Sequence, residues 1–97
     1  MRPFRNLKMA SVIQEELSAL LAREFNFNGA LVTILSVTVD EKFEEARIRI
    51  GVLPFEKELE AYTMVENRRR ELEHALLKKL NVKPFPHLKF EIASKGV

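Results

Sequence analysis

The sequence contains no cysteine, which removes disulfide bonds as a source of stability. Small secreted domains commonly depend on such bonds, so this absence favours an intracellular protein. No apolar run approaches the roughly 20 residues that a membrane-spanning helix needs. The basic residues near the start, Arg2 and Arg5, are not followed by the apolar segment of a signal peptide. We therefore expect a cytoplasmic protein with no membrane partner.

Motifs for catalysis and metal binding are missing as well. The sequence has no glycine-rich phosphate loop and no nucleophile elbow. His74 and His87 are its two histidines, and neither has the cysteine or carboxylate spacing of a zinc site. We expect no metal, no cofactor, no small-molecule substrate and no enzymatic activity. The expected state is a monomer.

Length and composition indicate one globular domain. The chain has 97 residues, of which 46% are hydrophobic and 31% are charged, a balance typical of folded chains. We expect a single domain over residues 1–97, ordered over about 5–93, with short flexible ends. The net charge is only +2, so nucleic-acid binding has to be argued from the distribution of charge.

The first half of the chain predicts one helix and two strands. Residues 7–25 carry a helical apolar stripe, which the Asn-Phe-Asn-Gly sequence at 26–29 ends. Alternating, β-branched residues predict a strand at 31–39, and strict alternation predicts another at 46–52. The short link between these strands indicates an antiparallel hairpin.

The second half predicts two helices and a third strand. Residues 56–80 are rich in helix formers and contain no glycine or proline. Pro84 and Pro86 define a loop, after which residues 87–92 alternate as a strand. The order helix, strand, strand, helix, helix, strand predicts a two-layer α+β fold, in which helices cover one face of a three-stranded sheet.

The inward-facing positions of these elements define the expected core. Arg47 and Arg49 alternate with core positions and would point away from it. The expected core residues are Ile13, Leu17, Leu20, Leu35, Val37, Ile48, Ile50, Val65, Leu72, Leu76, Leu88 and Phe90.

The sequence Glu-Asn-Arg-Arg-Arg-Glu at 66–71 does not fit one straight helix. A continuous helix would place Arg68 and Arg69 on the face that Leu72 and Leu76 bury. Burying unpaired guanidinium groups against an apolar core is costly. We therefore expect the helix to break within about two residues of Asn67, with Asn67 in a left-handed conformation, so that the arginines turn outward.

Three segments resemble the ribosome-binding factor A family of bacterial ribosome-maturation proteins. The helix segment "KMASVIQEELSALLAREF" is similar throughout to the family's first helix. "DEKFEEARIRI" keeps the spacing of the family motif before and in the second strand, with Asp40 and Lys42 as substitutions. "VKPFPHLKF" is similar to the motif that leads into the last strand. The three motifs occur in the family's order, and the resemblance covers about residues 5–92.

The resemblance implies a KH-like (type II) domain with α-β-β-α-α-β order. It also implies a factor that binds the small (30S) ribosomal subunit and its 16S rRNA during late assembly and rRNA processing. The family has a small Ala-x-Gly kink between its second and third helices, where this chain has Asn67, Arg68 and Arg69. Two alternatives remain: a general KH-like RNA-binding module, and a protein-interaction domain for an acidic partner.

The junction arginines Arg68, Arg69 and Arg70 are the first RNA-binding candidates. Arginines at a helix start can bind phosphate, together with the free N–H groups there. They can equally form local ion pairs, since Glu66 and Glu73 lie four residues from Arg70 and Arg69.

Further candidates lie outside the junction. Lys83 matches a basic position of the family, and Arg5 and Lys8 belong to a basic N-terminal segment. Lys78 and Lys79 are better explained as stabilising a helix C-terminus. Phe85 could stack on a base, but a core role is the preferred interpretation.

Overall fold

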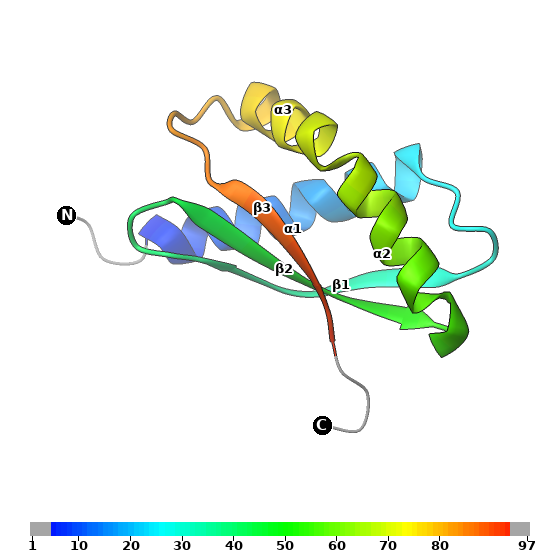
Figure 1. The fold of residues 1–97 in the computed structure, drawn as a ribbon. Helices are drawn as coiled ribbons and strands as arrows, with labels where there is room; N and C mark the ends of the chain where they lie inside the picture. Colours follow the sequence, from blue (N-terminus) through cyan, green and yellow to red (C-terminus); the bar gives the residue numbers. More distant parts are fainter. Residues whose placement is uncertain (1–4, 94–97) are drawn as a thin grey trace.

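The computed structural model describes residues 5–93 (Figure 1). The predicted element order and the KH-like α+β class are confirmed. The expectation of flexible ends concerns residues 1–4 and 94–97, which lie outside the described range. The elements are helix α1 (Arg5–Glu24), strands β1 (Leu31–Val39) and β2 (Glu45–Leu53), a 3-10 turn η1 (Phe55–Lys57), helices α2 (Glu58–Asn67) and α3 (Arg69–Leu80), and strand β3 (His87–Ile92).

The sheet has β2 at its centre. β1 pairs with β2 in the antiparallel sense that the hairpin prediction required, and β3 pairs with β2 in parallel. The inward side chains of β2 are buried under the helices, whereas Arg47 and Arg49 are exposed on the opposite face. The helices thus cover one face of the sheet, and the other face stays open (Figure 1).

Most of the predicted core is confirmed. The buried members are Ile13, Leu17, Ile48, Ile50, Val65, Leu72, Leu76, Leu88 and Phe90. Leu20 and Val37 are partly buried and pack against this core.

The prediction for Leu35 is wrong because β1 contains a bulge. Ile34 pairs with Ile50, but the next pair joins Ser36 to Arg49, so Leu35 is an extra residue. One extra residue reverses the inward and outward sides of a strand. Leu35 is therefore 53% exposed on the open face, with its side chain over Gly51.

The predicted break in the helical region near Asn67 is confirmed. α2 ends at Asn67 and α3 begins at Arg69, with no loop between them (Figure 1). Arg68, between the helices, has φ −109° and ψ 16°, in the bridge region rather than the helical one. The expected left-handed Asn67 is wrong, because this small departure at Arg68 is enough to change the helix direction. The left-handed asparagine of this helical region lies at its other end, where Asn81 caps α3 at φ 54°.

The β1–β2 turn is closed by one carboxylate. Asp40 Oδ1 accepts the backbone N–H groups of Glu44 and Glu45, each at 2.8 Å. The N–H of Glu45 contributes most to lowering the pKa of Asp40 below its usual value. Phe43 in this turn has φ 59°, and its ring packs against the core. The turn thereby holds an aromatic ring beside the start of α1.

Leu76 and Leu35 should differ sharply in their effect on stability. Leu76 is fully buried, so Leu76→Ala should lower the free energy of unfolding by about 2 to 5 kcal/mol. Leu35→Ala removes the same atoms from the open face and should cost no more than about 1 kcal/mol. Denaturant unfolding of both variants measures the contrast, and equal losses would contradict the bulge.

Glycine substitutions separate the two asparagines. Asn81→Gly should be neutral or stabilising by up to about 1 kcal/mol, since glycine adopts positive φ without steric strain. Asn67→Gly should instead destabilise by up to about 1 kcal/mol, because Asn67 is helical. Thermal unfolding of the two variants tests this order of stability. The reverse order would contradict a left-handed Asn81 and a helical Asn67.

Candidate nucleic-acid interface

Arg68 ties the start of α3 to the end of α1. Its Nη1 donates to the carbonyl oxygen of Glu24 at 3.1 Å, and its Nε donates to Glu71 Oε2 at 3.3 Å. The guanidinium also lies 4.4 Å from the centroid of the Phe25 ring, a cation–π contact. The Arg68 side chain is therefore already engaged within the domain.

Arg69 is held between two carboxylates. Its Nε donates to Glu66 Oε1 and its Nη1 to Glu73 Oε2, both at 3.0 Å. These hydrogen bonds, with Glu73 first, raise the pKa of Arg69 above its usual value. The Arg69–Glu73 pair is the one that the spacing suggested, whereas Glu66 pairs with Arg69 rather than with Arg70.

Glu73 connects the helix junction to the third strand. Besides Arg69, its Oε2 accepts the backbone N–H of Leu88 at 2.9 Å. Its Oε1 lies 3.6 Å from His87 Nδ1. The Glu73 side chain is only 18% exposed, so these partners satisfy a carboxylate that water reaches poorly. The start of β3 is thereby fixed to the middle of α3.

Arg70 and Lys83 meet at one hollow between α3 and the loop before β3, which we call the proline-loop hollow. Its volume is about 450 Å³. Both side chains are exposed, and neither has an ion pair among residues 5–93. The lining residues are Arg70, Glu73, His74, Leu77, Lys83, Pro84, Phe85, Pro86 and His87.

Sequence reasoning did not connect His74 and His87 with this hollow. His74 lies four residues after Arg70, so the two share a helix face, and that spacing was a readable signal. His87 follows the loop directly, but nothing in the sequence shows that the loop folds back along α3. Phe85 packs against the core as preferred, and it also lines the hollow.

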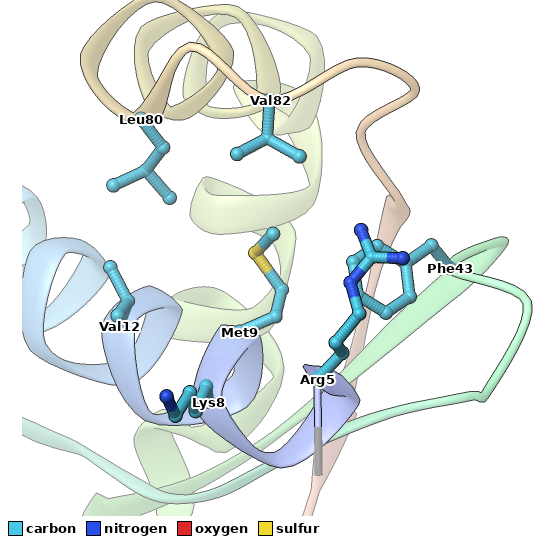
Figure 2. A pocket seen from close by; sticks show the side chains of 7 residues that line it. All are labelled: Arg5, Lys8, Met9, Val12, Phe43, Leu80 and Val82. Atoms are coloured by element: carbon cyan, nitrogen blue, oxygen red, sulfur yellow. The ribbon is translucent and has the colours of Figure 1, made fainter. Parts of the chain in front are cut away.

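Arg5 and Lys8 lie at a second hollow, about 360 Å³ in volume, between the start of α1 and the end of α3 (Figure 2). Arg5 lies 4.9 Å from the centroid of the Phe43 ring. Figure 2 shows apolar side chains from both helices and from the chain after α3 around this space. These are Met9, Val12, Leu80 and Val82. Arg5 and Lys8 thus lie at one hollow and Arg70 and Lys83 at the other, whereas Arg68 and Arg69 line neither.

Two features are absent from residues 5–93. No helix in this range is long and apolar enough to cross a membrane. In the same range, no three residues of histidine, cysteine, aspartate or glutamate form a group that could hold a metal ion.

The chain is similar to ribosome-binding factor A proteins in sequence. The family model described as ribosome-binding factor A matches residues 5–95. Ribosome-binding factor A of Chlorobium phaeobacteroides (strain BS1) is 32% identical over 89 residues, which are 89% of this chain and 77% of the relative. The protein of the same name from Ralstonia pickettii (strain 12J) is 34% identical over 87 residues, covering 89% of this chain and 70% of the relative.

Solved structures match the fold. The crystal structure of ribosome-binding factor A from Thermus thermophilus aligns with a TM-score of 0.76 at 17% identity, covering 90% of this chain and 94% of that one. A homology model of the Thermus thermophilus protein, fitted into a cryo-EM map of a 30S complex, aligns with a TM-score of 0.75 at 15% identity, covering 90% of this chain and 93% of that one. At these identities the likeness concerns the fold.

Two glutamates of α3 provide a test of the Glu73 contacts. Glu73→Ala should lower the free energy of unfolding by about 1 to 3 kcal/mol, because it leaves the Leu88 N–H without its acceptor and Arg69 with Glu66 as its remaining partner. Glu71→Ala removes a surface partner of Arg68 and should cost no more than about 1 kcal/mol. Denaturant unfolding compares the two, and equal costs would show that Glu73 does not connect α3 to β3.

Proposed function

The chain belongs to the ribosome-binding factor A family, and from this we propose that it binds the small (30S) ribosomal subunit and its 16S rRNA during late assembly and rRNA processing. The observation that carries this proposal is the family match over nearly the whole chain. The fitted complex of the Thermus thermophilus homologue with the 30S subunit supports the same partner.

The RNA contacts that we propose are electrostatic. Arg70 and Lys83, at the proline-loop hollow, are the leading candidates because their charges are not paired within residues 5–93. Arg5 and Lys8 form a second candidate group. Arg68 and Arg69 would have to exchange internal partners for phosphates, so we propose that they contribute less to RNA binding than Arg70 and Lys83. Such contacts position the protein on the RNA backbone rather than read its bases.

We propose that the protein acts by binding to a transient conformation of the RNA, not by catalysing a reaction. A factor that recognises backbone and shape can hold a transient RNA conformation without chemistry at any side chain. We accordingly propose a cytoplasmic monomer without enzymatic activity, cofactor or small-molecule substrate. A plain RNA-binding module without a ribosomal role would share the same contacts, and association with subunits distinguishes the two.

One observation favours a second candidate function, binding of an acidic protein partner. The open face of the sheet exposes Leu31, Leu35 and Leu53 near one end. Arg49 and Lys89 are exposed on the same face. Apolar anchors beside basic groups suit an acidic protein surface as well as RNA.

Charge reversal at two matched places tests the RNA proposal. Arg70→Glu with Lys83→Glu should weaken co-sedimentation with purified small subunits. Each lost phosphate contact should reduce the slope of log K against log salt by roughly 0.7 to 0.9. Replacing Arg68 and Arg69 is a poorer test of RNA binding, because it also breaks their ion pairs within the domain.

The control for this experiment is Arg49→Glu with Lys89→Glu. It changes the net charge by the same amount on the open face, where neither residue has an ion pair within residues 5–93. We expect the control to retain most of the affinity and the salt slope. Equal losses would mean that overall charge decides binding, and a larger loss in the control would favour the open face as the docking surface.

A further inference from the structure

We infer that a groove between α1 and α3 binds a helix of a protein partner, one that is amphipathic and carries acidic side chains beside its apolar face. This inference goes beyond the proposed function, because it concerns another class of partner and a different face of α3. Three features of the groove support it: its shape, its apolar lining and its charge.

The groove consists of two hollows that follow each other along the same two helices. The first, about 360 Å³ in volume, lies between the start of α1 and the end of α3 (Figure 2). The second, about 330 Å³, continues beside residues 16–23 of α1 and residues 75–79 of α3. Together we call them the α1–α3 groove. From Arg5 to Arg23 it follows α1 for roughly 27 Å, at 1.5 Å per residue, which accommodates about five turns of another helix.

The lining of the groove is largely apolar. Val12 is 41% exposed, and Leu20 and Leu80 are only partly buried. Ala19 and Ala75 line the second hollow from opposite helices, and their small side chains leave room for the backbone of a partner. Apolar residues that recur along one face of a helix, at positions i, i+3, i+4 and i+7, bind grooves of this kind.

The rim of the groove is basic. Its basic lining residues are Arg5, Lys8, Arg23, Lys78 and Lys79. Arg23 pairs with Glu24 at 3.2 Å, whereas the three lysines are exposed and have no ion pair among residues 5–93. Glu16 is the one carboxylate among the lining residues of the two hollows. Acidic side chains on the flanks of a bound helix would therefore complement the charge of both walls.

The apolar lining favours a protein over RNA as the ligand. Arg5 and Lys8 are the second candidate group for RNA, but the space beside them is lined mainly by aliphatic side chains (Figure 2). The aromatic ring in this lining, Phe43, has the Arg5 guanidinium 4.9 Å from its centroid, so that face of the ring is not free to stack on a base. An acidic amphipathic helix uses both the cations and the apolar surface. Arg5 and Lys8 therefore suit a protein ligand better than RNA.

α3 can serve the groove and the proline-loop hollow at the same time. Arg70, His74 and Leu77 line the proline-loop hollow, whereas Ala75 and Lys79 line the α1–α3 groove. At about 100° per residue, these two sets point in roughly opposite directions from the helix axis. A helix bound in the groove would thus leave the leading RNA candidates uncovered.

A second copy of the chain is the main competing occupant. Leu59 is 75% exposed on α2, between two glutamates, and could enter the groove of another copy. The positions three, four and seven residues later hold a half-buried Tyr62, Thr63 and Glu66. α2 therefore offers a single apolar anchor where the groove has room for several, which favours a helix of a different protein.

The test measures binding of fluorescein-labelled peptides by fluorescence anisotropy at about 0.15 M salt. The probe is an amphipathic peptide of about 18 residues, long enough for the groove, with leucine at helical spacing and glutamate and alanine elsewhere. Its controls are a scrambled peptide of the same composition and a peptide with lysine in place of glutamate. The probe should bind at least about 10-fold more tightly than either control. A control that binds as tightly as the probe would overturn the inference.

Two matched substitutions on α1 locate the bound peptide. Ala19→Trp fills the middle of the groove and should weaken binding of the probe at least about 10-fold. Ala22→Trp adds the same side chain where Ala22 is exposed and lines neither hollow, so this variant should bind like the original protein. Thermal unfolding checks that both variants are folded. Unaltered binding by folded Ala19→Trp would show that the peptide does not occupy the groove.

Charge reversal tests the role of the lysines. Lys8→Glu with Lys79→Glu should weaken binding of the probe by roughly 5- to 50-fold, because like charges then face each other across the groove. Arg49→Glu with Lys89→Glu changes the net charge equally on the open face and should retain most of the affinity. Equal losses would mean that net charge alone attracts the peptide, which would contradict a specific groove.

Two further measurements decide between the possible occupants. Unlabelled oligo(U) should fail to displace the probe at the same salt concentration, and displacement would assign the groove to RNA. Sedimentation equilibrium of the original protein should show a monomer. A dimer that Ala19→Trp dissociates and Ala22→Trp does not would make a second copy the occupant and overturn the inference.

Discussion

The carboxylate of Glu73 is the point at which three parts of the fold depend on one another. It accepts from Arg69 at the helix junction and from the backbone of Leu88 at the start of β3. A carboxylate that water reaches poorly is stable only with such partners. The same contacts hold the loop before β3 against α3. They therefore shape the proline-loop hollow, and they link the direction of α3 to the edge of the sheet.

The charge of the chain is nearly balanced, yet its distribution leaves local basic sites. Arg68 and Arg69 contact acidic residues within the domain, whereas Arg70, next in sequence, has no such partner among residues 5–93. Adjacent residues on a helix point about 100° apart, so three consecutive arginines meet three different environments. Two of them stabilise the junction, and the third is available to a ligand. A net charge of +2 therefore says little about the field at any one surface.

The bulge in β1 has a comparable effect on the open face of the sheet. Alternation in phase with Val37 and Val39, on the far side of the bulge, would have turned Leu35 toward the core. The extra residue instead exposes Leu35 over Gly51, where the absence of a side chain leaves room for it. The fold thus presents two chemically different surfaces, one basic with a recessed apolar floor and one broad with exposed leucines. This difference is the reason that charge reversal on the two surfaces can distinguish RNA binding from protein binding.

The sequence by itself determined the order of the elements and most of the core, because helical and strand periodicities are local properties of neighbouring residues. It also determined that the helical region must break near Asn67, since unpaired arginines cannot face an apolar core. Only the tertiary structure decided which residue carries the break, because Arg68 takes its conformation together with contacts to Glu24 and Phe25 far away in sequence. The register of β1 likewise depends on its pairing with β2. The alternation of residues within β1 does not show where the bulge in that pairing lies. The meeting of Arg70 with Lys83 depends in the same way on how the loop packs against α3 through Glu73, a contact between residues 15 apart in sequence.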